Sequence, residues 1–173
     1  RYEAGQVLYK GALLDAIACY EKGESPTFDT RIADAARALL ADADRDPSYI
    51  VRALSMPGFS VLEQEFDTIP VDSILKASRF YREQMALSLK DECTALYQRY
   101  DAWLKQKGHA LDGENVGRRE LKNFCLGLMN EIEGSDAPQL LMQQMKSADN
   151  MTDSLTALAT MAQRDNAECD EAL

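Results

Sequence analysis

The sequence predicts an all-α protein, an irregular array of antiparallel helix pairs that resembles an armadillo or HEAT superhelix. Apolar residues recur along most of the chain at steps of three or four, the spacing that places them on one helix face. No segment shows the alternation of apolar and polar residues that a half-buried strand requires. Short loops make neighbouring helices antiparallel, and the pairs recur at roughly 40 residues. No sequence motif repeats at a fixed period, as it would in a regular repeat protein. A closed helical bundle is therefore the alternative to an open array.

The first predicted helix begins at about Tyr2, so the chain is already helical where it starts. Because the sequence opens with Arg1 instead of methionine, we expect a piece of a longer or processed polypeptide. A break from Gly23 to Pro26 ends the helix. Its apolar stripe comprises Tyr9, Leu13, Ile17 and Tyr20.

Three shorter helices are predicted next. One runs from about Thr30 to Ala41 with an apolar face, and one runs from Pro47 to about Leu54 with Asp46 as its cap, since proline suits the first helical position. The third is expected to begin at Ser60, because the sequence Ser60-Val61-Leu62-Glu63 has the spacing of a capping box.

The longest predicted element is a single central helix from about Ser73 to Lys105, with Asp72 as its cap. Its stripe is unbroken by glycine or proline. The stripe comprises Ile74, Ala77, Tyr81, Met85, Leu89, Cys93, Leu96 and Tyr100. Because it is long and has apolar residues on both sides of the stripe, we expect it to contact neighbours on two sides.

The region from Lys107 to Gly117 is polar and rich in glycine, which predicts a loop. The clearest amphipathic pattern follows it and comprises Leu121, Phe124, Cys125, Leu128, Met129 and Ile132. Phe124 lies on this stripe, so we expect it in the core, where truncation to alanine would cost roughly 3 to 5 kcal/mol.

Two short helices are predicted after this amphipathic segment. The first follows Gly134 and carries Leu140, Leu141, Met142 and Met145. The second begins at Met151, with Asn150 as its N-cap and Asp153 where the helix dipole favours an acidic side chain. Its apolar face is expected to comprise Leu155, Leu158, Ala159 and Ala162.

Composition excludes several classes of function. The 173 residues fit one helical domain, residues 1–173, and the formal net charge of −10 repels phosphate backbones and anionic lipid surfaces. Nucleic acid and membranes are therefore not expected as partners. No apolar run is long enough to span a bilayer and no signal peptide precedes the first helix, so we expect a soluble, cytoplasmic protein.

The four cysteines are Cys19, Cys93, Cys125 and Cys169. Their spacing matches neither a paired-cysteine metal site nor the disulfide framework of a small secreted protein. We interpret them as reduced thiols that pack at apolar helix positions.

The search for catalytic motifs is largely negative. A zinc hydrolase helix needs two histidines one turn apart, and this chain has only His109, in a polar loop where we expect it to be solvated. The glycine-rich phosphate loops and the nucleophile elbow of hydrolases are also absent. Cysteine–histidine catalysis stays open, because its partners need not be adjacent in sequence. We assign no catalytic, cofactor-binding or metal-ligating residue.

Two basic clusters and a set of methionines have structural interpretations. Arg118–Arg119 and Arg79 with Arg82 lie among many acidic residues, so we expect solvated or ion-paired surfaces rather than ligand sites. Methionines fill irregular core space, and we expect this role before that of a binding groove. They are Met129, Met142, Met145, Met151 and Met161.

Three blocks of sequence resemble, in the same order, the C-terminal helical region of the bacterial-type aminopeptidase N family. They are Arg1-Tyr2-Glu3-Ala4-Gly5-Gln6, Arg118-Arg119-Glu120-Leu121-Lys122-Asn123-Phe124-Cys125-Leu126 and Asp149-Asn150-Met151-Thr152-Asp153-Ser154-Leu155. The sequence between these blocks, including Phe66-Asp67-Thr68-Ile69-Pro70, is also similar, so the resemblance covers most of the chain. None of the blocks is a catalytic signature, and helix caps and packing account for each.

The resemblance implies a parent zinc metallo-aminopeptidase that releases N-terminal amino acids from peptides. In that family, an HExxH helix and a downstream glutamate hold zinc, and a Gly-x-Met-Glu-Asn type motif binds the free amine of the substrate. Neither motif occurs here, so the zinc is expected in the parent's catalytic domain, the partner of this chain. The chain would then enclose the active-site cavity and limit access of peptide substrates, and the fragment alone would be inactive. A freestanding helical-repeat interaction scaffold is the alternative.

Overall fold

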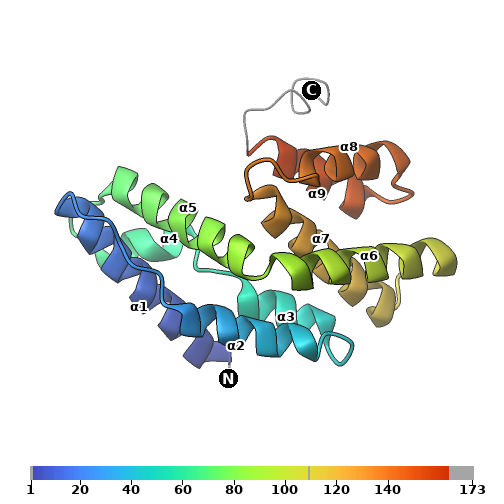
Figure 1. Ribbon diagram of the computed structural model, residues 1–173, viewed down its shortest axis with the longest axis horizontal. Helices are drawn as coiled ribbons and strands as arrows, with labels where there is room; N and C mark the ends of the chain where they lie inside the picture. Colours follow the sequence, from blue (N-terminus) through green and yellow to red (C-terminus); the bar gives the residue numbers. More distant parts are fainter. Residues whose placement is uncertain (1, 109, 164–173) are drawn as a thin grey trace.

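The computed structural model describes residues 2–108 and 110–163, and these residues form helices without any β-strand. Neighbouring helices run back and forth in an elongated, layered array (Figure 1). The predicted all-α class is therefore confirmed. The elements are α1 (Tyr2–Glu21), α2 (Thr30–Ala41), α3 (Pro47–Leu54), α4 (Phe59–Leu62), the 3-10 helix η1 (Glu63–Glu65), α5 (Val71–Ser88), α6 (Lys90–Lys107), α7 (Gly113–Asn130), α8 (Ala137–Ser147) and α9 (Met151–Met161).

The helices pack mainly as pairs, with α1 against α5, α6 against α7, and α8 against α9. Helix α7 also contacts α3, α5, α8 and α9, so it joins the N-terminal helices to the C-terminal pair. Most of its side chains are buried as a result, including Leu121, Cys125 and Leu126. The central helix of the array is thus α7.

The predicted single helix from Ser73 to Lys105 is wrong, because α5 ends at Ser88 and α6 begins at Lys90. Leu89 lies between them with φ −113° and ψ 13°, yet its side chain is fully buried and the apolar stripe continues across the break. Arg37 of α2 donates through Nη2 to the Ser88 carbonyl at 2.7 Å. A side chain that bonds a helix carbonyl is a known cause of kinks, and here the bond comes from a distant element.

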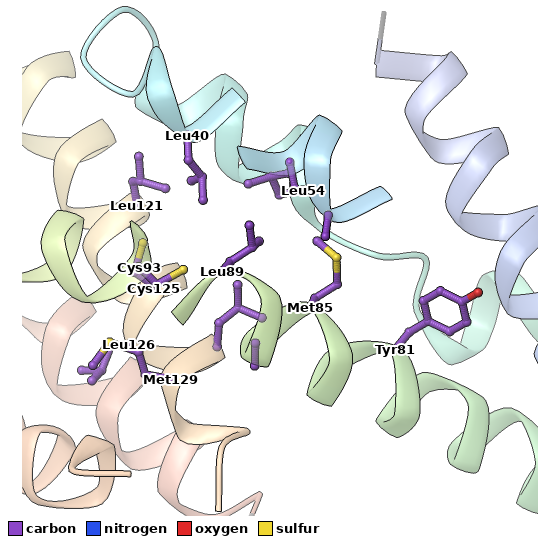
Figure 2. Close-up of a cluster of buried hydrophobic side chains, with 14 of the residues drawn as sticks. Leu40, Leu54, Tyr81, Met85, Leu89, Cys93, Leu121, Cys125, Leu126 and Met129 are labelled. Atoms are coloured by element: carbon purple, nitrogen blue, oxygen red, sulfur yellow. The ribbon is translucent and has the colours of Figure 1, made fainter. Parts of the chain in front are cut away.

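The apolar stripe predicted for the long helix is buried as expected, since all eight of its residues lie in the core. Figure 2 shows Tyr81, Met85 and Leu89 of this stripe following one another, with Leu89 at the end nearest to Leu121 and Leu126 of α7. The break at Leu89 therefore turns the chain without interrupting the hydrophobic core. It allows α5 to pack on α1 while α6 packs on α7.

Three predicted helix starts are wrong. Ser60 lies inside α4, whose N-cap is Gly58 without a side-chain bond. Asp72 lies in the first turn of α5, because that helix begins at Val71 after Pro70, where the helix dipole still favours the acid. Helix α7 begins at Gly113, with Asp112 as its cap, so the predicted loop to Gly117 is shorter.

Gly117 explains why a glycine-rich segment belongs to α7. A side-chain carbon at this position would lie 3.1 Å from Ser48 Oγ and 3.5 Å from a carbon of Pro47. The missing side chain therefore lets α7 approach the start of α3 closely. The glycine-rich sequence suggested a loop at this position, but Gly117 lies in a helix and allows close packing against α3.

Other predicted elements are confirmed. The bounds of α2 match the prediction, Asp46 caps α3 by accepting from the Tyr49 amide at 2.9 Å, and Asn150 caps α9 by accepting from the Asp153 amide at 2.9 Å. The predicted apolar face of α9 is wrong. Its buried residues are Asp153, Ala157 and Met161, while Leu155 and Met151 are exposed.

The remaining core predictions have mixed outcomes. Phe124 is half-buried and packs against the edge of the core. Met129, Met142 and Met161 are buried as expected, Met145 is half-buried, and Met151 is 70% exposed. The methionines are thus core residues except at the start of α9.

Candidate functional site

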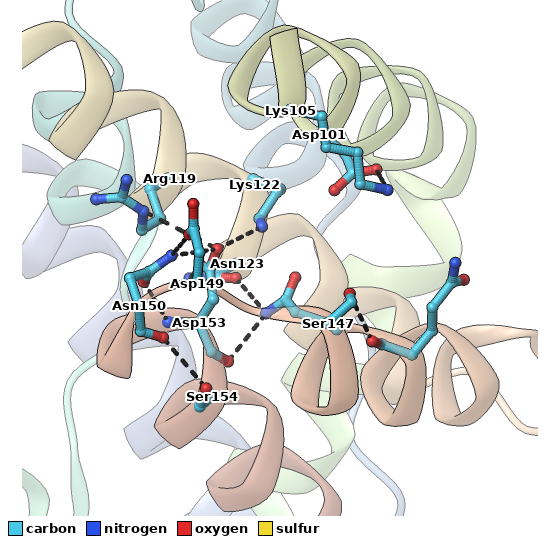
Figure 3. A network of polar contacts seen from close by, with 12 residues as sticks. Asp101, Lys105, Arg119, Lys122, Asn123, Ser147, Asp149, Asn150, Asp153 and Ser154 are labelled. Atoms are coloured by element: carbon cyan, nitrogen blue, oxygen red, sulfur yellow. Dashed lines mark hydrogen bonds and ion pairs between the residues drawn. The ribbon is translucent and has the colours of Figure 1, made fainter. Parts of the chain in front are cut away.

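A buried polar cluster joins α7 to α8 and to the start of α9, as Figure 3 shows. We call it the Asp153 cluster. Its members are Arg119, Lys122 and Asn123 of α7, Gln144 of α8, and Asn150 and Asp153 at the start of α9. It is the most deeply buried group of charged side chains among the described residues.

The local sequence brings these side chains together. Lys122 and Asn123 lie between Leu121 and Cys125, on the flank of the apolar stripe of α7 that faces α8 and α9. The cap bond from Asn150 fixes the first turn of α9. That turn points the Asp153 side chain toward α7.

The carboxylate of Asp153 accepts two short hydrogen bonds. Its Oδ2 lies 2.8 Å from Lys122 Nζ, and its Oδ1 lies 2.8 Å from Asn123 Nδ2. Lys122 is 3% exposed and Asp153 is 6% exposed, so this ion pair is almost fully withdrawn from water. The Nε atom of Arg119 lies 3.9 Å from the same Oδ2. A buried charge is tolerated when it is paired and hydrogen-bonded, and Asp153 meets both conditions.

Gln144 connects α8 to the cluster. Its Nε2 donates to Asn123 Oδ1 at 2.8 Å and to the backbone carbonyl of Asp153 at 3.2 Å. The side chain of Asn150 donates to Asp153 Oδ2 at 3.3 Å. The hydrogen bonds therefore close a ring through α7, α8 and α9, and this ring fixes the C-terminal pair on α7.

A cavity of about 210 Å³ lies beside the cluster, and Tyr97, Asp101 and Lys105 of α6 line its other wall. Burial raises the pKa of Tyr97 to about 12, and the negative charges of Asp101 and Asp153 act in the same direction. Tyr97 therefore remains a neutral phenol in neutral solution. Nothing in this arrangement activates a nucleophile, so the chemistry that it supports is charge pairing and hydrogen bonding.

The sequence prediction missed the depth of this cluster. Arg119 is ion-paired, one of the two expectations for it, but the pair is not at the surface, because Arg119 is 5% exposed. For Asp153 the sequence suggested only the interaction with the helix dipole, whereas the side chain is 6% exposed. The local pattern hides this burial, since Lys122 and Asn123 occupy the positions between Leu121 and Phe124 that an amphipathic surface helix fills with polar residues. Their partner Asp153 is 31 residues away from Lys122, and no local pattern relates the two.

The other basic residues form the surface pairs that the sequence predicts. Arg79 pairs with Glu83 at 2.8 Å, and Arg82 lies 3.6 Å from Glu131. Arg118 pairs with Glu114 at 2.9 Å. It also stacks on an aromatic ring, with its guanidinium carbon 4.1 Å from the ring centre of Trp103, a favourable cation–π arrangement.

Phe124 lines a second, mostly apolar hollow of about 580 Å³ between α1, α3, α5 and α7. Its position there explains why the side chain is only half-buried. The other apolar residues that line this hollow are Leu13, Leu54, Met56, Pro57, Phe59, Leu75, Met85 and Leu128.

The described residues do not fit a metal site, because no group of three or more histidine, cysteine, aspartate or glutamate side chains among them could hold an ion. His109 lies outside the described residues, so its predicted solvation stays a prediction. Within residues 2–108 and 110–163, no helix is both long and apolar enough to cross a membrane.

One family model and two curated relatives match the sequence of this chain. Residues 1–173 match the family model described as "Domain of unknown function (DUF3458_C) ARM repeats". Over 159 residues, the chain is 29% identical to aminopeptidase N of Escherichia coli strain K12 and 25% identical to aminopeptidase N of Haemophilus influenzae. These alignments cover 92% of this chain but only 18% of each relative. The chain thus spans about a fifth of the length of the curated relatives that it matches.

A solved structure shows the same fold. The crystal structure of Legionella pneumophila aminopeptidase A in complex with aspartic acid superposes with a TM-score of 0.78 at 20% sequence identity. The match covers 99% of this chain and 20% of that chain. The helix array therefore occurs as one part of a much longer protein.

Proposed function

The chain belongs to the family of ARM-repeat domains that the DUF3458_C model describes, and from this premise we propose that it is the C-terminal helical domain of a metallo-aminopeptidase. Its parent would release N-terminal amino acids from peptides. The observation that carries the proposal is the alignment with two aminopeptidases N over 92% of this chain and 18% of theirs. The order of the three sequence blocks supports it.

In this proposal the chain limits access to the active site and performs no chemistry. A rigid helical array suits that role, because it can cover a cavity and admit only peptide ends. The Asp153 cluster contributes by fixing α8 and α9 on α7. The net charge of −10 supports a second effect, attraction of the positively charged amino end of a peptide.

The proposal places the zinc ion in the catalytic domain of the parent, which would be the partner of this chain. The residues described here do not form a metal site, so no catalytic step is assigned to them. Peptides would be the substrates of the whole enzyme, and a cytoplasmic location is part of the same proposal.

A length series of peptides tests the access role. The intact parent enzyme is compared with a version that lacks the region of this chain, using an aminoacyl anilide, short peptides and an unfolded protein as substrates. We expect the intact enzyme to favour the short substrates, and the truncated enzyme to lose that preference. Turnover of the anilide and the zinc content report whether the catalytic domain is intact in both forms.

Two results would contradict the proposal. The same dependence on peptide length in both forms would show that this domain does not limit access. A parent without any aminopeptidase activity would favour the alternative, a helical-repeat scaffold that binds other proteins.

A further inference from the structure

Two buried thiols meet where α6 packs against α7. Cys93 of α6 is 1% exposed and Cys125 of α7 is 0% exposed, and both belong to the hydrophobic core. Figure 2 shows the two side chains next to each other, between Leu89 and Leu121 on one side and Leu126 on the other. Both cysteines are free thiols.

The two thiols interact directly in the folded chain. A hydrogen bond with Cys93 and burial raise the pKa of Cys125 well above its ordinary value. Thiolate is the form that attacks disulfides and oxidants, so Cys125 reacts slowly in the native fold. The contact between the two side chains also brings their sulfur atoms close together, which is the first requirement for a bond between them.

The position of the pair distinguishes it from the other cysteines. Cys19 lies half-buried on α1, and Cys169 lies outside the described residues. Cys93 and Cys125 instead sit on two helices that follow each other in sequence and pack along their lengths. A bond between them would close a loop that contains the whole connection from α6 to α7.

We propose that Cys93 and Cys125 are a disulfide-forming site, which is oxidised when the chain folds in the presence of a disulfide oxidant. In the first step, one cysteine thiolate attacks oxidised glutathione and releases one glutathione thiolate. In the second step, the other cysteine attacks the mixed disulfide and releases a second glutathione thiolate. The two protons lost by the cysteines end on the two glutathione molecules, so the protein is oxidised by two electrons and the glutathione disulfide is reduced.

Burial determines when this reaction occurs. In the native fold, both sulfur atoms are shielded from a reagent as large as glutathione. Oxidation therefore requires local opening of α6 from α7, or takes place while the chain folds. Once formed, the bond restricts the unfolded chain more than the folded one, which raises stability. The disulfide thus locks α6 on α7 under oxidising conditions.

The test uses the 173-residue chain with Cys19→Ser and Cys169→Ser, which leaves only the pair. The chain is reduced in urea and refolded with oxidised glutathione. We expect mass spectrometry to find one peptide pair linked through Cys93 and Cys125, and both thiols to resist alkylation. The oxidised form should melt roughly 5 to 10 °C above the form reduced with dithiothreitol.

Three results would overturn the proposal. They are two free thiols after refolding, a glutathione adduct on each cysteine, or a linked product that melts below the reduced protein. The third would show that the bond does not fit the native packing of α6 on α7. A matched control with Cys93→Ser added should form only a glutathione adduct and gain no rise in melting temperature.

A second arm tests the role of burial. The folded, reduced protein is incubated with the same oxidant, with and without urea below the unfolding transition. We expect slow oxidation that accelerates with urea, because opening limits the reaction. Oxidation of the folded protein at the rate of the unfolded chain would overturn this part of the inference.

Discussion

Replacement of Asp153 by alanine should destabilise the fold by about 3 to 5 kcal/mol, the usual cost of breaking a buried ion pair. The structure gives the reason. Lys122 is 3% exposed and its ammonium group lies 2.8 Å from Asp153 Oδ2. Without that carboxylate, a positive charge stays buried without its ion-pair partner. The change also removes the acceptor for Asn123 Nδ2.

Removal of the other partner of the ion pair, Lys122, should cost less stability. In a Lys122→Met variant, Asp153 keeps its hydrogen bonds from Asn123 and Asn150, so we expect a loss of about 1 to 3 kcal/mol. Because the two residues act as a pair, the double variant Lys122→Met/Asp153→Ala should lose less than the two single losses together. The difference is the coupling energy, expected at roughly 1 to 3 kcal/mol.

Urea unfolding followed by far-UV circular dichroism measures these free energies. The matched control is Asp101→Ala, which breaks the ion pair of Asp101 with Lys105 at 2.7 Å on the other wall of the same cavity. Lys105 is 62% exposed in its side chain, so this loss should stay below about 0.5 kcal/mol. If Asp153→Ala costs no more than the control, burial of the pair does not contribute to stability and our reasoning is refuted.

Three further changes have expected outcomes. The free energy of unfolding should fall as the pH rises from 10 toward 12, because burial raises the pKa of Tyr97 from 10.0 to about 12 and the folded state keeps a proton that the unfolded state releases. In urea unfolding at alkaline pH, the Tyr97→Phe variant should show a weaker decline. An equal decline in the variant would contradict this cause. Asn150→Ala should cost about 1 kcal/mol in urea unfolding because it removes the cap of α9, and no change would mean that the cap bond is weak in solution. Phe124→Ala should cost roughly 1 to 3 kcal/mol, less than Leu121→Ala at about 2 to 5 kcal/mol, because Phe124 is only half-buried; the opposite order would place Phe124 in the core.

The sequence predicted the elements whose signals are local. The apolar stripe from Ile74 to Tyr100 determines which residues enter the core, and the caps Asp46 and Asn150 determine where two helices begin. Both signals depend on residues within a few turns of each other. Such patterns can be recognised without knowledge of the fold.

The elements that the sequence did not predict depend on distant residues. The break at Leu89 is accompanied by a bond from Arg37 to Ser88, which is 51 residues away in sequence. The burial of Asp153 depends on Lys122, and the helical role of Gly117 depends on contact with α3. In each case, tertiary contact decides between local structures that the sequence alone leaves open.

The most direct measurement of the central claim compares bound zinc and peptidase activity in the parent protein and in the 173-residue chain. The account predicts that the parent binds zinc, releases N-terminal residues from peptides and loses this activity when a chelator removes the metal. The isolated chain should be helical, bind no stoichiometric zinc and hydrolyse no aminoacyl substrate. Tightly bound zinc in the isolated chain, together with chelator-sensitive peptidase activity, would contradict the account.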